Sequence, residues 1–214
     1  MVLFRSIKSQ SGVSLISLLV GITISLITAL AMLTLFRHSI RITADTTQIS
    51  KQDAERTSAM TIAPILLQDA GFGINNARVS DNIIALKGAT FSASNKLSGT
   101  VAANDKTANA LVWLRNLGTN FECSALFAAP DKGLLLLGPI NCAGLTTWST
   151  ANWATGKPLA SLGTFNFLLS NTAGTCSQFG YASLGKATIT LQSNNAIGQP
   201  VSSQSCLSNL VVSP

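Results

Sequence analysis

The sequence predicts an α+β protein in which a long N-terminal α-helix packs on a β-rich C-terminal head held by disulfides. Three observations lead to this fold class. Residues 9–36 form a stretch of 28 positions without a charged side chain. Neither proline nor glycine occurs from residue 23 to residue 63, so a helix can continue through this region. From residue 72 onward, short apolar runs alternate with Gly, Asn, Ser and Pro, and all four cysteines fall there.

The composition limits the class of protein. The 214 residues carry a formal charge of +6, 47% are hydrophobic and only 10% are charged, while Ser, Thr, Asn and Gln make up about a third. A disordered chain would have many charges and few apolar residues, so this chain is expected to fold. A cytosolic enzyme would carry more surface charge. The composition is therefore typical of an exported protein.

The apolar run at residues 13–36 is long enough to cross a bilayer, because 24 helical residues at ~1.5 Å each span ~36 Å against a hydrocarbon core of ~30 Å. Its Ser and Thr hydroxyls can bond back to helical carbonyls. One interpretation is a secretory signal cleaved after Ala31, in the A-x-A pattern that begins at Ala29. Another is an uncleaved membrane anchor with its basic end in the cytoplasm.

A third interpretation starts from a short basic leader that ends at Gly12 and is followed directly by the apolar run from Val13. This arrangement resembles the class III signal of type IV pilins and type II secretion pseudopilins. The resemblance implies cleavage after Gly12 by prepilin peptidase, N-methylation of Val13, and a helix that stays in the mature protein for packing into a fibre. The family usually carries Glu at the fifth mature position, which is Ser17 here. Because a tip subunit has no subunit ahead of it to pair with that Glu, Ser17 favours a minor or tip role.

The second half of the helix turns polar but keeps apolar residues at 42, 49, 59, 62 and 66. Their spacing predicts a weak stripe that packs on the head, with Asp45, Asp53, Glu55 and Arg56 on the solvated side. Pro64 is expected to kink the helix. Gly71 and Gly73 are expected to end it.

Residues 56–73, with the closing run Gln-Asp-Ala-Gly-Phe-Gly at 68–73, resemble the helix end of PilW-like minor pilins. The run at residues 109–115 is similar to the first core strand of that family's head. The resemblance implies three parts: a leader at 1–12, a stalk helix at 13–71 whose residues 13–36 form the transmembrane and fibre-core segment, and a head at 72–214.

Six segments of the head are predicted as strands. The clean alternation at residues 187–191 predicts a half-buried strand, whereas the continuous apolar run at 134–137 predicts burial on both faces. The predicted strands cover residues 82–86, 110–117, 124–128, 133–137, 164–169 and 187–191.

The cysteines Cys123, Cys142, Cys176 and Cys206 are separated by 19, 34 and 30 residues. No C-x-x-C pair is present, so a zinc cluster is not expected. An even count in an exported domain predicts two disulfides, and three pairings are open. We favour Cys123–Cys142 and Cys176–Cys206, which close the shortest loops, each worth roughly 3–4 kcal/mol by the chain-entropy model.

The sequence contains no catalytic constellation, so neither an enzyme nor a cofactor or metal is expected. The one histidine, His38, follows the apolar run. Two binding hypotheses are weaker than an assembly role. Trp148 and Trp153 could stack on a sugar or host surface if exposed. DNA binding would need the scattered basic residues to converge, namely Lys87, Lys96, Lys106, Arg115 and Lys132.

The resemblance implies a minor pilin that primes type IV pilus assembly or lies in its tip complex. Its expected partners are other minor and major pilins, prepilin peptidase and the inner-membrane assembly platform. Before assembly the chain would cross the inner membrane once, with its head in the periplasm, and afterwards it would lie in the pilus. A type II secretion pseudopilin and a signal-anchored or secreted β-rich binding domain remain the alternatives.

Overall fold

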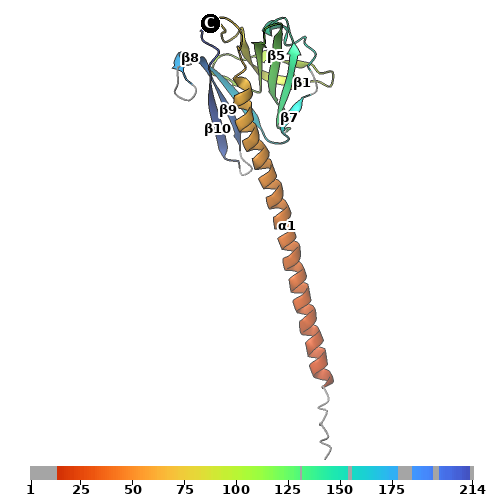
Figure 1. Cartoon of the computed structure of the whole chain (residues 1–214). Helices are drawn as coiled ribbons and strands as arrows, with labels where there is room; N and C mark the ends of the chain where they lie inside the picture. The colour runs from red at the N-terminus through yellow and green to blue at the C-terminus, as the bar shows by residue number, and fades with distance from the viewer. Residues whose placement is uncertain (1–13, 131, 154–155, 178–184, 195–197, 213–214) are drawn as a thin grey trace, which may run out of the picture. The chain divides into compact units, whose positions relative to one another are not determined.

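The computed structural model describes residues 14–130, 132–153, 156–177, 185–194 and 198–212. These residues form one long helix, α1 (Leu15–Leu67), a short 3-10 helix, η1 (Leu145–Thr147), and ten strands. The chain divides into two compact units, Met1–Gln48 and Ile49–Pro214. The last nineteen residues of α1 therefore belong to the same unit as the strands, which Figure 1 shows beside the helix end. The predicted α+β fold is confirmed.

The strands form two antiparallel sheets. The six-stranded sheet has the order β2-β1-β4-β5-β6-β7 and the four-stranded sheet the order β10-β9-β8-β3. The strands of the first sheet are β1 (Ile83–Phe91), β2 (Leu97–Val101), β4 (Ala110–Asn116), β5 (Phe121–Ala128), β6 (Leu134–Asn141) and β7 (Lys157–Ala160). Those of the second are β3 (Thr107–Ala108), β8 (Phe165–Cys176), β9 (Gly185–Asn194) and β10 (Pro200–Leu207).

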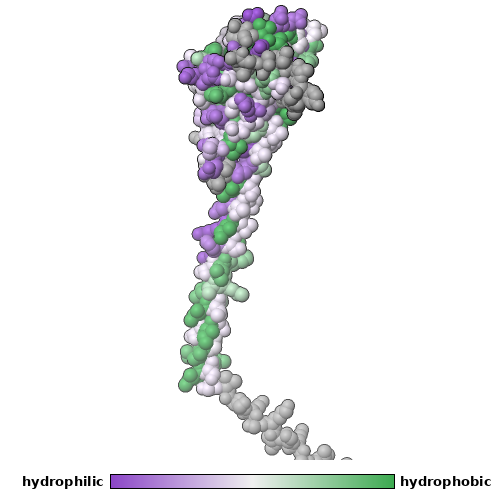
Figure 2. Space-filling model, turned by 90° about the vertical axis from the view of Figure 1, so that its left-hand side faces the viewer, coloured by the Kyte–Doolittle hydropathy of each residue, from purple (hydrophilic) through white to green (hydrophobic). Residues whose placement is uncertain are grey.

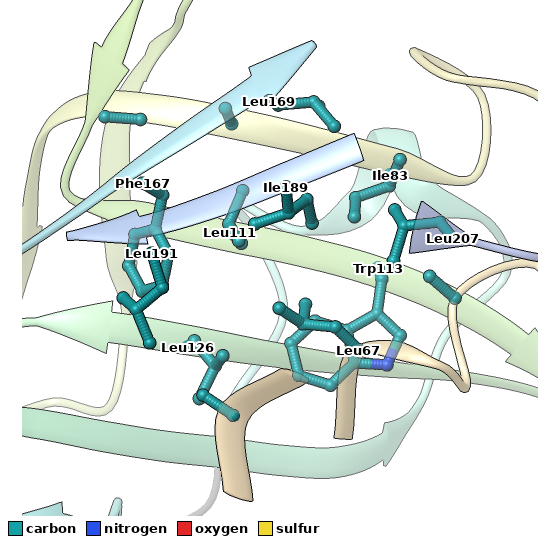
Figure 3. Close-up of a cluster of buried hydrophobic side chains, with 14 of the residues drawn as sticks. Leu67, Ile83, Leu111, Trp113, Leu126, Phe167, Leu169, Ile189, Leu191 and Leu207 are labelled. Atoms are coloured by element: carbon teal, nitrogen blue, oxygen red, sulfur yellow. The ribbon is translucent and has the colours of Figure 1, made fainter. Parts of the chain in front are cut away.

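The six-stranded sheet is buried on both faces. One face packs with the end of α1 and the four-stranded sheet in a cluster that includes Leu67, Trp113 and Ile189, and Figure 3 shows Leu67 beside Trp113. The other face packs under Leu145 and Trp153. The run at residues 134–137 contributes alternately to the two clusters, which confirms its predicted burial on both faces. Alternation in β9 is also confirmed, because residues 187, 189 and 191 all enter the first cluster.

The predicted apolar stripe of α1 is wrong in most positions. The buried helix residues are Arg56, Ala59, Met60, Ala63 and Leu67, spaced at 3, 4, 7 and 11 residues from the first. Of the predicted stripe, position 59 is buried and position 66 packs partly, but positions 42, 49 and 62 are exposed. Ala59 and Ala63 are both fully buried in the cluster that the helix shares with the sheets.

The helix continues past Pro64 and ends at Leu67. The turn that follows requires glycine at two positions. Gly71 has a φ of +76°, and a Cβ there would lie 2.8 Å from the Ala77 side chain. Gly73 has a φ of +69°, and a Cβ there would lie 2.0 Å from the Asn116 carbonyl oxygen. Both are left-handed conformations that glycine adopts without strain. These glycines shape the turn after the helix, but the helix itself ends at Leu67, four residues before the predicted end at residue 71.

Candidate functional site

The N-terminal part of α1 is an apolar surface with no partner inside the described chain. Every described residue from 14 to 50 is exposed, including Leu15 at 78% and Met32 at 76%. Figure 2 shows these hydrophobic side chains gathered along the helix. Among the described residues, α1 is the one helix long and apolar enough to cross a membrane. At ~25 cal/mol per Å², so many exposed apolar side chains strongly favour transfer out of water.

Three threonine hydroxyls within this segment bond to the helix's own carbonyls. Thr23 Oγ1 donates to the Val20 carbonyl at 2.9 Å, and Thr28 Oγ1 donates to a carbonyl three residues earlier at 2.9 Å. Thr34 Oγ1 does the same at 2.7 Å. An unpaired hydroxyl in hydrocarbon would cost several kcal/mol, about 4–8 in the least polar reference solvent. The helix can therefore enter a lipid or protein interior with these polar groups already paired, as the sequence predicted.

The residues of the predicted processing site lie at or beyond the start of the described chain. Gly12 and Val13 fall outside the described residues. Ser17 lies in the first turn of α1 and is exposed. A side chain at position 17 is therefore available to another molecule.

Both favoured disulfides are present. Cys123–Cys142 joins β5 to the residue after β6, with the two Cα atoms 5.8 Å apart. Cys176–Cys206 joins the end of β8 to β10, with a Cα separation of 5.7 Å. This second bridge passes beside the start of β9, where a Cβ on Gly185 would come within 2.8 Å of Cys206 Sγ. Glycine at this position makes room for the bridge.

An ion pair fastens the turn after α1 to the six-stranded sheet. Arg115 on β4 binds Asp69 through Nη1 at 2.6 Å and Glu122 of β5 through Nη2 at 2.8 Å. Burial acts to lower the pKa of Arg115, but the hydrogen bonds to Glu122 and Asp69 outweigh it, and the net pKa is raised. Arg115 is therefore committed to a structural cluster.

A second tether joins α1 to the loop between β7 and β8. Glu55 accepts hydrogen bonds from the backbone N–H and the hydroxyl of Ser161. The side-chain bond and then the backbone bond lower the pKa of the Glu55 carboxyl below its ordinary value.

Sequence reasoning missed the burial of Arg56, which it placed on the solvated side. The residue is 7% exposed, and its Nη1 lies 2.6 Å from Asp53 Oδ1. A Cβ on Gly163 would lie 3.2 Å from Arg56 Nη2, so the guanidinium packs against that loop. The signal in the sequence was the pair of opposite charges three residues apart on one helix, which neutralises the arginine as it is buried.

The structure weakens both binding hypotheses, sugar stacking on Trp148 and Trp153 and DNA binding by the scattered basic residues. Trp153 is fully buried and donates from Nε1 to the Trp148 carbonyl at 3.0 Å, so it cannot stack on a ligand. Trp148 is half-buried. Of the basic residues weighed for DNA binding, Arg115 is held in its ion cluster and Lys96 Nζ donates to the Thr150 carbonyl at 2.5 Å. In the part of the chain that the structure describes, no three His, Cys, Asp or Glu residues gather as metal ligands.

Comparisons with family models, with curated proteins and with solved structures find no match to this chain.

Proposed function

We propose that this chain is a minor pilin of the PilW-like kind that takes part in type IV pilus assembly, in priming or in the tip complex. The observation that carries the proposal is the unpartnered apolar part of α1. A membrane holds such a segment before assembly, and neighbouring helices hold it in a fibre. The class III-like leader ending at Gly12 and the disulfide-held head support the same function.

The proposed function is structural. The precursor crosses the inner membrane once with its head in the periplasm, prepilin peptidase cuts after Gly12, and Val13 is methylated. The apolar helix then packs with other minor and major pilins on the inner-membrane assembly platform. Ser17 in place of the usual Glu suits a subunit that does not need to pair with the amine of a subunit ahead of it.

The experiment that tests this is intact mass and N-terminal sequencing of protein from native membranes and sheared fibres. A matched pair of variants separates the two cleavage pathways. Gly12→Leu is expected to block maturation, because the peptidase must bring the scissile backbone close to its active site. Ala31→Leu alters the A-x-A pattern and is expected to leave maturation unchanged.

A mature protein that starts at N-methyl-Val13 and is present in fibres supports the proposal. A start at Met32 that Ala31→Leu abolishes refutes it in favour of a secreted domain. An intact Met1 in cells with active prepilin peptidase refutes it in favour of a plain membrane anchor. A start at Val13 with the protein confined to a secretion apparatus instead identifies a pseudopilin.

A further inference from the structure

A groove of about 450 Å³ lies on the face of the six-stranded sheet that is turned away from α1. This volume is within the range of small-molecule sites, about 300–1,000 Å³. Ile84, Leu114 and Leu145 are buried and form its floor. Its sides come from segments far apart in the sequence, namely residues 74–82, Val101, Phe121 and residues 143–148.

One side of the groove is aromatic and firmly held. It carries Trp148, which is half-buried, and Phe121, which is 38% exposed. The Trp148 backbone is fixed at both ends, since its N–H donates to the Leu145 carbonyl at 3.2 Å and its carbonyl accepts from Trp153 Nε1 at 3.0 Å. The Cys123–Cys142 disulfide fixes the start of the same segment. The backbone that carries the indole is therefore held in place before a ligand arrives, which lowers the entropy cost of binding.

Another part of the lining is polar and consists of Ser80, Asp81 and Asn82. Ser80 has a φ of +74°, a conformation that a non-glycine residue keeps only where its surroundings hold it. Its N–H donates to the Ile83 carbonyl at 3.0 Å. The Asp81 side chain is 64% exposed, and its Oδ2 lies 3.3 Å from Arg78 Nε. The Asp81–Arg78 pair leaves this side polar but close to neutral.

We propose that this groove binds a neutral saccharide ring. A pyranose has an apolar C–H face that can stack on Trp148 and a rim of hydroxyls that can bond to Ser80, Asp81 and the amide nitrogen of Asn82. The Asn82 Oδ1 already accepts from the Arg78 N–H at 3.0 Å. A purely apolar ligand would remove water from the Ser80 and Asp81 side chains without replacing its hydrogen bonds. An anion would face the Asp81 carboxylate, and a cation would compete with Arg78 for it. The inference does not depend on the role in pilus assembly.

The test uses the full chain in phospholipid nanodiscs prepared without glycoside detergents, which carry sugars of their own. The probes are glucose, galactose, mannose and N-acetylglucosamine, with the acyclic polyol sorbitol as the control. Trp113 and Trp153 are buried, so acrylamide quenching of tryptophan fluorescence reports chiefly on Trp148. At least one pyranose is expected to protect Trp148 where sorbitol does not.

Variants then locate the site by saturation-transfer NMR. Trp148→Ala is expected to weaken binding about tenfold, the equivalent of a lost aromatic contact. Val101→Arg fills the groove from a side chain that is 56% exposed, so it blocks binding without disturbing the core. Phe72→Ala removes an aromatic that is 51% exposed outside the groove lining and is expected to change nothing.

The proposal is overturned if none of the four sugars protects Trp148 more than sorbitol does. It is also overturned if saccharide binding persists in folded Trp148→Ala and Val101→Arg. Loss of binding in Phe72→Ala with retention in Val101→Arg would place the site elsewhere and equally refute the groove.

Discussion

The same substitution is expected to change the free energy of unfolding by different amounts at two fully packed tryptophans. Trp113 on β4 is 2% exposed and Trp153 is 0% exposed. Trp153 Nε1 donates to the Trp148 carbonyl at 3.0 Å, whereas Trp113 Nε1 is buried without a hydrogen-bond partner. Replacing each by Phe removes the same atoms, so the packing losses are comparable and largely cancel when the two variants are compared.

The remaining difference comes from the indole N–H. Trp153→Phe loses one hydrogen bond, which is worth about 1 kcal/mol net. Trp113→Phe removes a buried unpaired donor and recovers its desolvation penalty of about 1–3 kcal/mol. Trp153→Phe should therefore lower the free energy of unfolding by about 2–4 kcal/mol more than Trp113→Phe.

The assay is equilibrium denaturation of the full, oxidised chain, followed by far-UV circular dichroism so that the readout does not depend on the substituted fluorophores. The double variant is expected to show the sum of the two effects, because the residues lie in different clusters on opposite faces of the sheet. Equal losses in the two single variants, or a larger loss in Trp113→Phe, would refute the reasoning.

Three further predictions concern pH, assembly and the turn after α1. Folding lowers the pKa of Glu55 below its ordinary value of 4.5, because the carboxylate accepts hydrogen bonds from Ser161. These bonds therefore stabilise the fold above pH 4.5, and their contribution to stability is lost as the pH falls below 4.5 through the lowered pKa. The free energy of unfolding of Glu55→Gln should depend less on pH below pH 4.5 than that of the wild type. The same dependence of this free energy on pH in both proteins would contradict the prediction. If the proposed function holds, Ser17→Glu should raise the amount of this protein in sheared fibres relative to wild type. Ser25→Glu, the same change elsewhere on the apolar helix, should not raise it. Equal amounts of the two variants would count against the role of position 17. Gly73→Ala should abolish folding or lower the free energy of unfolding by about 3 kcal/mol or more, because its Cβ would lie 2.0 Å from the carbonyl oxygen of Asn116 on β4. Gly88 has a φ of +60° and open space around it, so Gly88→Ala should lower the free energy of unfolding by only about 1–2 kcal/mol. Thermal denaturation of the two variants measures the difference.

The strands that the sequence predicted are the inner ones. The six predicted segments correspond to β1, β4, β5, β6, β8 and β9, which have a neighbour on each side. The four missed strands, β2, β3, β7 and β10, are the outermost strands of the two sheets. Edge strands are partly solvated and short or polar, so they lack the apolar alternation that marks a buried strand. β10, which reads Pro-Val-Ser-Ser-Gln-Ser-Cys-Leu, is an example.

Long-range contacts account for the other differences. The buried face of α1 carries Ala59 and Ala63, and such small side chains give a weaker apolar signal in the sequence than the exposed Ile42, Ile49 and Ile62. Arg56 is buried because Asp53 and Gly163 surround it, and Gly163 is more than a hundred residues away. The disulfide pairing was predictable because loop closure favours near neighbours.

The contacts between α1 and β10 bear on how the protein is made. Gln68 at the helix end donates to Ser205 Oγ and to the Cys206 carbonyl, and Asn209 Nδ2 donates back to the Gln68 carbonyl. Leu207 and Leu210 fill the same cluster as the helix residues. Because β10 follows every other described strand in the sequence, the end of α1 completes its packing only after the other strands have been synthesised. A folding intermediate in which β10 has not yet docked therefore exposes an apolar face at the end of α1, and that face disappears when β10 is in place.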